Sequence, residues 1–186
     1  ELGGKNPFIV LKDADLNYAV DCAAFGIYMH QGQVCMASSR IIVEDPVYDE
    51  FCAKFVAKTR TIKVGDPRDP STVIGPIIRE SHCAFVDAHI QDAVAKGAKL
   101  LTGGTHDGPF YQPTVLAGVT DKMLLTREET FGPVAPVFKF SQDDQAIAAR
   151  PRCAQLQRGR GVMGVGRIQD GDQDPRVDDA QRRDHV

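Results

Sequence analysis

The sequence predicts an α/β protein in which a largely parallel sheet is flanked by helices. Short apolar runs alternate along the chain with longer stretches in which apolar residues recur at helical spacing. This alternation is typical of parallel sheets, because parallel strands must be joined by a long crossover, usually a helix. The 186 residues, 42% of them hydrophobic and 25% charged, suffice for one domain with a core, or for one domain and a tail.

The first half of the chain supplies two strands and two helices. Residues 8–11 form an apolar run that predicts a buried strand, and the β-branched run over 40–43 predicts another. Asp13 and Asp15 are the candidate N-caps of the helix between them. Asp45 and the proline after it open the second helix, since proline is tolerated in a first helical turn.

The second half continues the alternation. A helix is expected over 79–96 and should stop at Gly97, because glycine readily adopts the left-handed conformation that ends helices. Three further strands are expected, at 99–102, 111–116 and 134–140. Pro113 lacks the N–H that a sheet ladder needs, which favours the sheet edge for its strand.

The composition changes near residue 150. The segment 150–186 is rich in Arg, Asp and Gln, poor in large apolar residues, and without a persistent helical or strand period. Such a segment cannot bury enough apolar surface to offset the entropy lost on folding. We therefore expect a domain over 1–149 and a disordered C-terminal tail over 150–186.

Charge and cysteine content exclude several classes of protein. The net charge of −3 and the pI near 5.9 give no support for a nucleic-acid partner. No apolar run approaches the ~20 residues that span a membrane, and no secretion leader is seen. The five cysteines show no C-x-x-C spacing, so no metal site is expected and reduced thiols in the cytoplasm fit better.

Cys35 differs from the other cysteines in its setting. It follows a turn at Gly32 and precedes a β-branched run, so it lies at a helix-to-strand junction that a substrate can reach. Cys22, Cys52 and Cys83 fall within helical patterns and are expected to be small buried hydrophobes. The same plain interpretation stays open for Cys35, although nearby backbone N–H groups would favour its thiolate.

Two carboxylate motifs accompany this cysteine. Glu1 is followed by Gly3 and Gly4, which let the backbone pass close to a cofactor ring or a substrate. Glu128 and Glu129 precede an aromatic residue and a Gly-Pro turn. The plain alternatives are a solvated terminal charge and an ordinary loop, but carboxylates also accept hydrogen bonds from sugar hydroxyls.

The order of these motifs resembles the NAD(P)-dependent aldehyde dehydrogenase superfamily over residues 1–149. The resemblance is carried by Glu-Leu-Gly-Gly-Lys at 1–5, Gly-Gln-Val-Cys at 32–35 and Glu-Glu-Thr-Phe-Gly-Pro at 128–133. Shorter matches occur in the same order at 39–40, 64–67, 75–76 and 111–116. It implies the fold of that family's catalytic domain and the oxidation of an aldehyde to a carboxylic acid.

The resemblance implies a covalent reaction. Cys35 attacks the aldehyde to give a thiohemiacetal, with its own backbone N–H as one oxyanion donor. Hydride transfer to the nicotinamide leaves a thioester. Glu1 acts as the general base that activates water to release the acid.

The resemblance also implies an NAD or NADP cofactor. Glu129 would hold the nicotinamide ribose with Phe131 beside it, and Leu2 and Gly3 would lie close to the nicotinamide ring. Most of the cofactor site in this family belongs to an upstream domain, and the chain starts at Glu1 without Met, so we expect the true N-terminus upstream. The choice between NAD and NADP depends on that domain and stays open.

Two positions bear on the subclass. Many members have Gln and Lys against the adenosine ribose where this chain has His82 and Phe85, so that contact is not expected here. His30, just before the cysteine motif, resembles the branch that oxidises benzaldehyde, vanillin and salicylaldehyde. A merely polar helix end is the alternative interpretation of His30.

The expected partner is a small-molecule aldehyde, with neither nucleic acid nor membrane, and the parent enzyme is expected to be a homo-oligomer. The chain alone is expected to be inactive, so a non-catalytic fragment without the cofactor-binding half is the alternative. A thiol hydrolase that uses Glu1 and Cys35 on esters is a third possibility.

A shift of reading frame near residue 149 is our hypothesis for the tail. Codons for 180–185, read one base later, can encode an Asn-Gly-Ala-Thr segment of the kind that the family has in this region. A genuine divergent or linker tail is the alternative, and the coding DNA decides between them.

Overall fold

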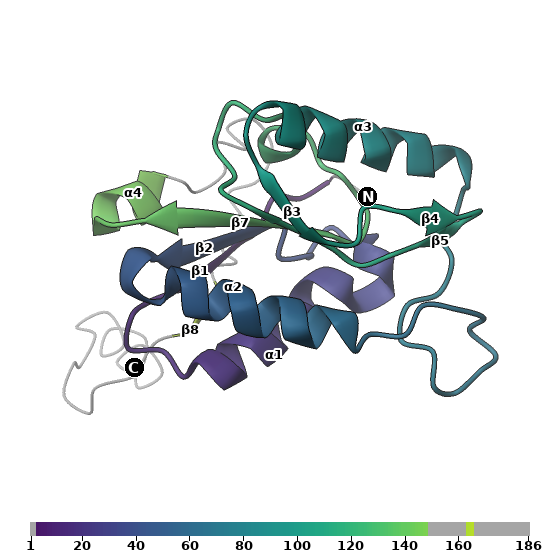
Figure 1. The fold of residues 1–186 in the computed structure, drawn as a ribbon, viewed down its shortest axis with the longest axis horizontal. Coiled ribbons are helices and arrows are strands. Elements are labelled where there is room, and N and C mark those ends of the chain that lie inside the picture. Colours follow the sequence, from purple (N-terminus) through teal and green to yellow (C-terminus); the bar gives the residue numbers. More distant parts are fainter. Residues whose placement is uncertain (1–2, 149–162, 166–186) are drawn as a thin grey trace, which may run out of the picture.

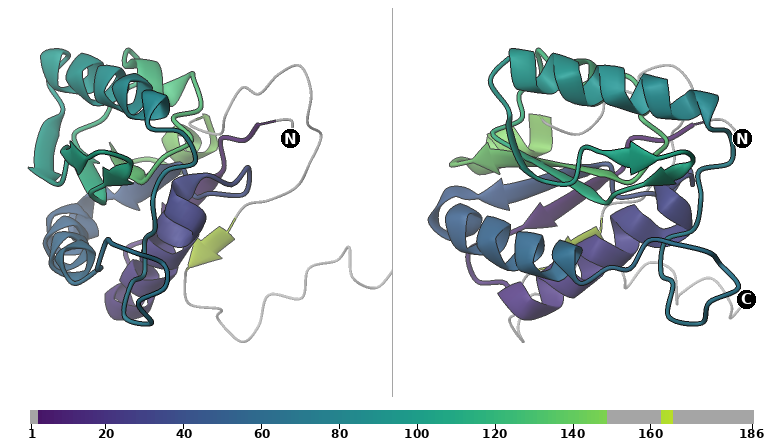
Figure 2. Two further views of the ribbon diagram at one scale, coloured as in Figure 1. Left: turned by 90° about the vertical axis from the view of Figure 1, so that its right-hand side faces the viewer. Right: turned by 45° about the vertical axis from the view of Figure 1, so that its right-hand side comes forward.

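The computed structural model describes residues 3–148 and 163–165 and has a mixed sheet between two helical layers (Figures 1 and 2). The main sheet has six strands in the order β3-β6-β7-β2-β1-β8. Only β3 runs antiparallel to its neighbour among these described strands. The strands are β1 (Pro7–Val10), β2 (Arg40–Glu44), β3 (Lys99–Thr102), β6 (Thr114–Ala117), β7 (Val134–Phe140) and β8 (Met163–Val165). The predicted largely parallel α/β fold is confirmed.

The helices cover the two faces of this sheet (Figure 1). On one face lie α1 (Leu16–Tyr28) and α2 (Asp45–Arg60), and on the other lies α3 (Ser81–Ala95). The shorter elements are η1 (Met29–Gly32), β4 (His106–Asp107), β5 (Phe110–Tyr111), η2 (Leu124–Thr126) and α4 (Asp143–Ala148). Gly97 follows α3 at φ +100°, so the predicted helix stop is confirmed.

Two sequence predictions differ from the structure. The strand expected over 111–116 divides into β5 and β6, and β6 is interior rather than at the edge. Pro113 precedes β6 and takes no place in its register, so its missing N–H costs the ladder nothing. Within the segment predicted to be disordered, the described residues are Met163–Val165, and they pair in parallel with β1. The rest of 149–186 lies outside the described residues.

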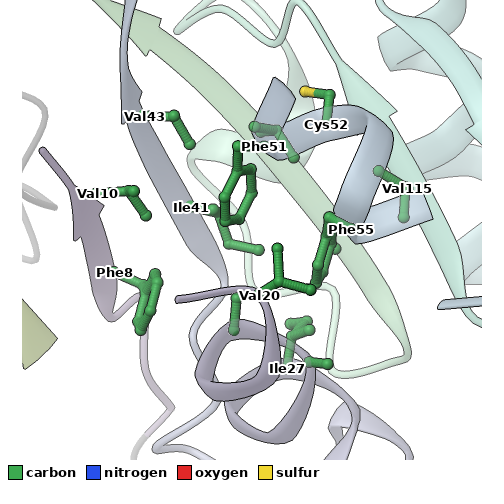
Figure 3. Close-up of a cluster of buried hydrophobic side chains, with 14 of the residues drawn as sticks. Phe8, Val10, Val20, Ile27, Ile41, Val43, Phe51, Cys52, Phe55 and Val115 are labelled. Carbon is green, nitrogen blue, oxygen red and sulfur yellow. The ribbon is translucent and has the colours of Figure 1, made fainter. Parts of the chain in front are cut away.

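The core is built from strand residues that alternate between the two helical layers. Ile41 and Val43 pack with the α1–α2 layer, whereas Ile42 packs with the α3 layer, as expected for a strand buried on both faces. Figure 3 shows the first of these clusters around Phe51 and Phe55. The rings of these two residues stack with centroids 5.5 Å apart, and both are fully buried. These contacts fix α2 on the sheet.

Helix α1 begins at one of the two predicted caps. Asp15 Oδ1 accepts hydrogen bonds from the backbone N–H of Asn17 at 2.9 Å and of Tyr18 at 3.2 Å. These bonds satisfy two of the N–H groups that a helix start leaves without helical partners. Asp15 is therefore the N-cap, and Asp13 is not.

We expect Asp15→Ala to lower the free energy of unfolding by ~1 kcal/mol, because it removes the cap of α1. Urea unfolding of the chain measures this change. Asp13→Ala is the matched control and should have little effect, since its charge is the same and it caps nothing. Equal effects of the two substitutions would contradict the assignment of the cap.

Among the described residues, no helix combines the length and the apolar character needed to cross a membrane.

Candidate active site

The loop that carries Cys35 is shaped by a left-handed turn. His30, Gln31 and Gly32 follow α1 with φ of 50°, 60° and 69°. A Cβ on Gly32 would lie 2.2 Å from the carbonyl oxygen of Gly132, so only glycine allows the two turns to meet. The turn reverses the chain out of α1 and leaves the Cys35 residue half-buried ahead of β2.

The segment before β1 lies against this loop. Asn6 Nδ2 donates to the carbonyl oxygens of Cys35 at 2.6 Å and Ala37 at 3.2 Å. A Cβ on Gly4 would lie 1.9 Å from the Cys35 oxygen, so the backbone of Gly4 touches the cysteine directly. Gly4 therefore allows a close approach to the cysteine loop, whereas the expected approach of the paired glycines to a cofactor ring or a substrate stays a prediction.

Glu129 lies on the other side of the same glycines. Its Oε1 accepts a hydrogen bond from Gly4 N at 3.0 Å. A Cβ on Gly3, which has φ +76°, would lie 2.9 Å from Glu129 Oε2. Phe131, two residues on, has φ +48°, an unfavourable backbone conformation outside glycine. Gly4 thus contacts both Glu129 and the Cys35 loop.

Sheet topology explains why three distant segments meet. The strands β1, β2 and β7 are adjacent and parallel, so the residues that precede them emerge at one edge of the sheet. Those residues are 3–6, 32–39 and 128–133, the same segments that carry the sequence motifs. Open α/β sheets usually bind ligands at the carboxyl ends of their strands. Here the motifs gather at the amino ends.

Helix α3, on the other face of the sheet from α1 and α2, contacts the segment that carries Glu129. His82 Nε2 lies 3.0 Å from the carbonyl oxygens of both Thr130 and Phe131. His89 Nδ1 lies 3.0 Å from Thr130 Oγ1. The ring of Phe85 packs between the two imidazoles, with centroids 5.3 Å from His82 and 4.3 Å from His89.

Two glutamines join the cysteine loop to the chain that leads into α3. Gln33 Oε1 accepts a hydrogen bond from Ile78 N at 3.0 Å. The Gln31 amide, oriented so that both of its ends are paired, accepts from Gly75 N at 2.8 Å and donates to the His30 carbonyl at 2.8 Å. The cysteine loop is therefore also held by the chain that leads into α3.

The structure brings together Cys35, Gly3, Glu129 and the backbone of Phe131 among the predicted site residues. Glu1 and Leu2 lie outside the described residues. Sequence reasoning missed Asn6, which lies outside the motifs that indicate chemistry. It also gave no partner to His82 and His89, since helical spacing shows that they share a face of α3 but not what they face.

His89 is a buried titratable group of this region. Its side chain is almost fully buried, and Nε2 lies 3.5 Å from Glu128 Oε2 but forms no hydrogen bond. Burial lowers the pKa of His89, and the Glu128 carboxylate opposes this shift only in part. The imidazole is therefore neutral in the folded chain at pH 7.

We expect the free energy of unfolding to fall as the pH is lowered from about 7 to 5. The unfolded imidazole binds a proton near its ordinary pKa of about 6.5, whereas the native one, with its lowered pKa, does not. Urea unfolding at several pH values measures the slope, and His89→Gln should flatten it in this window. Asp66, Asp69 and Asp92 have lowered pKa values, so their contribution is lost only below about pH 4. An unchanged slope in the Gln variant would contradict the prediction.

The chain's thiols are unpaired where the structure describes them. Cys22, Cys35, Cys52 and Cys83 are all free, with Cys52 and Cys83 buried. The described residues contain no group of three or more His, Cys, Asp or Glu side chains that could hold a metal ion. The half-buried Cys35 is thus a free thiol at the meeting point of the three segments.

Comparison with known proteins identifies relatives of this chain. A family model described as the aldehyde dehydrogenase family matches residues 1–153. A vanillin dehydrogenase from Pseudomonas fluorescens is 52% identical over 147 residues, covering 79% of this chain and 30% of that protein. An NADP(+) succinate-semialdehyde dehydrogenase from Schizosaccharomyces pombe is 47% identical over 151 residues, covering 79% of this chain and 31% of that protein.

Solved structures agree with these matches. An aldehyde dehydrogenase from Brucella melitensis biovar abortus 2308 has a TM-score of 0.77 at 50% identity, covering 79% of this chain and 31% of that one. An E. coli NADP dependent enzyme has a TM-score of 0.83 at 38% identity, covering 89% and 34%. The chain spans about 30% of the length of the curated relatives named above. Since the family match extends over most of its length, the chain belongs to the aldehyde dehydrogenase family.

Proposed function

We propose that this chain is the catalytic segment of an NAD(P)+-dependent enzyme that oxidises an aldehyde to a carboxylic acid, with Cys35 as its nucleophile. The observation that carries the proposal is the contact of Gly4 with both the Cys35 loop and Glu129. That contact brings the backbone of Cys35, which carries a half-buried free thiol, close to Glu129, although the two residues are far apart in the sequence. The Glu129 carboxylate can accept hydrogen bonds from sugar hydroxyls.

The proposed chemistry of the chain's own residues is covalent. The Cys35 thiolate forms a bond to the aldehyde carbon, and the carbonyl electron pair moves to oxygen, near the backbone N–H of Cys35. When bound, the nicotinamide would accept the hydride that leaves this carbon. Glu1 would take a proton from the water that cleaves the resulting Cys35 thioester, which frees the acid and restores the thiol.

The residues present fit the nicotinamide half of such a cofactor. Glu129 would hold the ribose hydroxyls, with Phe131 beside it and Leu2 and Gly3 near the ring. Glu129 Oε1 accepts the hydrogen bond from Gly4 N, so this carboxylate already acts as a hydrogen-bond acceptor beside the glycines, the role that ribose hydroxyls would also require of it. A Cβ on Gly3 would lie 2.9 Å from Glu129 Oε2, so glycine lets the backbone pass close to this carboxylate.

An aromatic aldehyde is the proposed substrate class. His30 precedes the cysteine loop, and relatives at 52% and 42% identity are named vanillin and benzaldehyde dehydrogenases. Relatives named for succinate semialdehyde are also close, at 47% and 45% identity. Benzaldehyde and succinic semialdehyde are therefore the two substrates to compare.

The alternative function is that of a non-catalytic fragment without the cofactor-binding half. It is favoured by the share of the relatives that the chain spans, about 30%. We further propose that residues 1–149 are a partial catalytic domain, supported by a family match that ends at residue 153. A frameshifted or divergent segment then follows, and a cytoplasmic location and a homo-oligomeric parent remain predictions.

Formation of NADH or NADPH tests the proposal. The chain alone, given benzaldehyde and either cofactor, should produce neither. A chimera in which residues 1–148 replace the matching segment of the Pseudomonas fluorescens vanillin dehydrogenase should reduce one of them. A folded chimera that stays inactive with both aldehydes, while the unmodified relative is active, would favour the non-catalytic fragment. Turnover by the chain alone would show that the upstream half is not required.

A further inference from the structure

We infer that His82 and His89 of α3 are positioning residues, which hold the loop 128–131 and thereby fix Glu129 and Phe131 for the cofactor. This inference rests on the proposed function, in which Glu129 and Phe131 of this loop bind the cofactor.

Thr130 is held by α3 at two points, its backbone carbonyl and its side-chain hydroxyl. His82 Nε2 lies 3.0 Å from its carbonyl oxygen and 3.0 Å from that of Phe131. Carbonyl oxygens only accept, so His82 carries its proton on Nε2 and donates to both. His89 Nδ1 lies 3.0 Å from Thr130 Oγ1, and the threonine is buried. Both the backbone and the side chain of this residue are therefore tied to α3.

The two imidazoles are themselves locked in place. Phe85 packs against both rings, at spacings that bring all three residues to one face of α3. Asp92, one turn beyond His89, accepts a hydrogen bond from Leu124 N at 2.7 Å and so ties η2, which precedes the loop 128–131, to α3. We call His82 and His89 together the histidine clamp. The packing on α3 holds both rings in the orientation that their bonds to the loop require, so the clamp is preorganised.

The loop has a feature that needs such a clamp. Phe131 has φ +48°, a conformation that residues other than glycine adopt only when their surroundings hold them. The bonds from His82 end on the two carbonyls that flank this residue's φ angle. Without them the backbone can relax, and Glu129 would lose its alignment with Gly4 N, 3.0 Å away.

Hydrogen exchange of the full chain tests the clamp without any cofactor. His82→Leu should raise amide exchange over 128–132 by about tenfold or more, because local opening follows the loss of the contacts that close it. His82→Gln, whose amide can still donate, should restore most of the protection. Amides of β2 and β7 report that the core is intact. His106→Leu is the matched control, since that imidazole also bonds to a carbonyl, of Gly108, but does not touch the loop.

Kinetics of the chimera test the consequence for the cofactor. His82→Leu should raise the cofactor KM by about tenfold, a factor typical of one lost hydrogen-bonding group, and leave the aldehyde KM nearly unchanged. His82→Gln should recover most of the loss. If exchange and cofactor KM stay unchanged in an active chimera, or if His106→Leu has the same effects, the inference fails while the proposed function stands. Activity that survives Cys35→Ser would instead overturn the proposed function.

Discussion

Cys35→Ser in the chimera is expected to lower kcat for aldehyde oxidation by at least about a thousandfold, as is usual when a covalent nucleophile is removed. A serine hydroxyl is a far weaker nucleophile than a thiolate. The same substitution in the chain itself should abolish acetylation by p-nitrophenyl acetate. Mass spectrometry after mixing detects the single acetyl adduct and needs no cofactor.

Cys22→Ser provides the matched control for this experiment. Cys22 is also free and only partly buried, but it lies on α1 away from the three meeting segments. This variant should keep both the acetyl adduct and the turnover of the chimera. If the adduct forms on Cys22, or if Cys35→Ser keeps full turnover, Cys35 is not the nucleophile.

Gly32→Ala is expected to lower the free energy of unfolding by ~3 kcal/mol, the size of a local backbone strain that cannot relax cheaply. Gly32 has φ +69°, which alone costs alanine about 1–2 kcal/mol. The added Cβ would also lie 2.2 Å from the Gly132 carbonyl oxygen, and the atom that must move belongs to a backbone. Because this contact joins the cysteine loop to the Glu129 loop, Cys35 acetylation should slow as well.

Gly118→Ala separates the two causes of this loss. Gly118 has nearly the same φ, +66°, but a Cβ there meets nothing within 4 Å. The control should therefore lose only about 1–2 kcal/mol, the cost of the left-handed alanine. Urea unfolding of both variants gives the difference. Equal losses would mean that the two turns do not meet as the structure shows.

Hydrophobic periodicity predicted the elements well because it records which faces are buried. The apolar runs at 8–11 and 40–43 became adjacent parallel strands, and the helix expected over 79–96 became α3. The edge position predicted from Pro113 was wrong, because the missing N–H matters only if that residue pairs in the sheet, and it does not. Pairing is a property of the neighbours, which local sequence does not specify.

The sequence predicted which segments form the candidate site, but not the contacts between them. Cys35 and Glu129 were identified by motif order, but their shared contact with Gly4 depends on β1, β2 and β7 being adjacent. Asn6 has no distinguishing pattern, and its bonds to Cys35 and Ala37 exist only because β1 starts beside β2.

By itself, the sequence determined the α/β class and the family, and it predicted the residues proposed to carry the chemistry, because these follow from periodicity and from the order of short motifs. Only the tertiary structure decided that the motifs meet at the amino ends of three parallel strands, and that His82 and His89 face the Glu129 loop. The physical reason is that strand order and helix placement arise from burial across the whole chain, so they bring together residues that no local pattern connects.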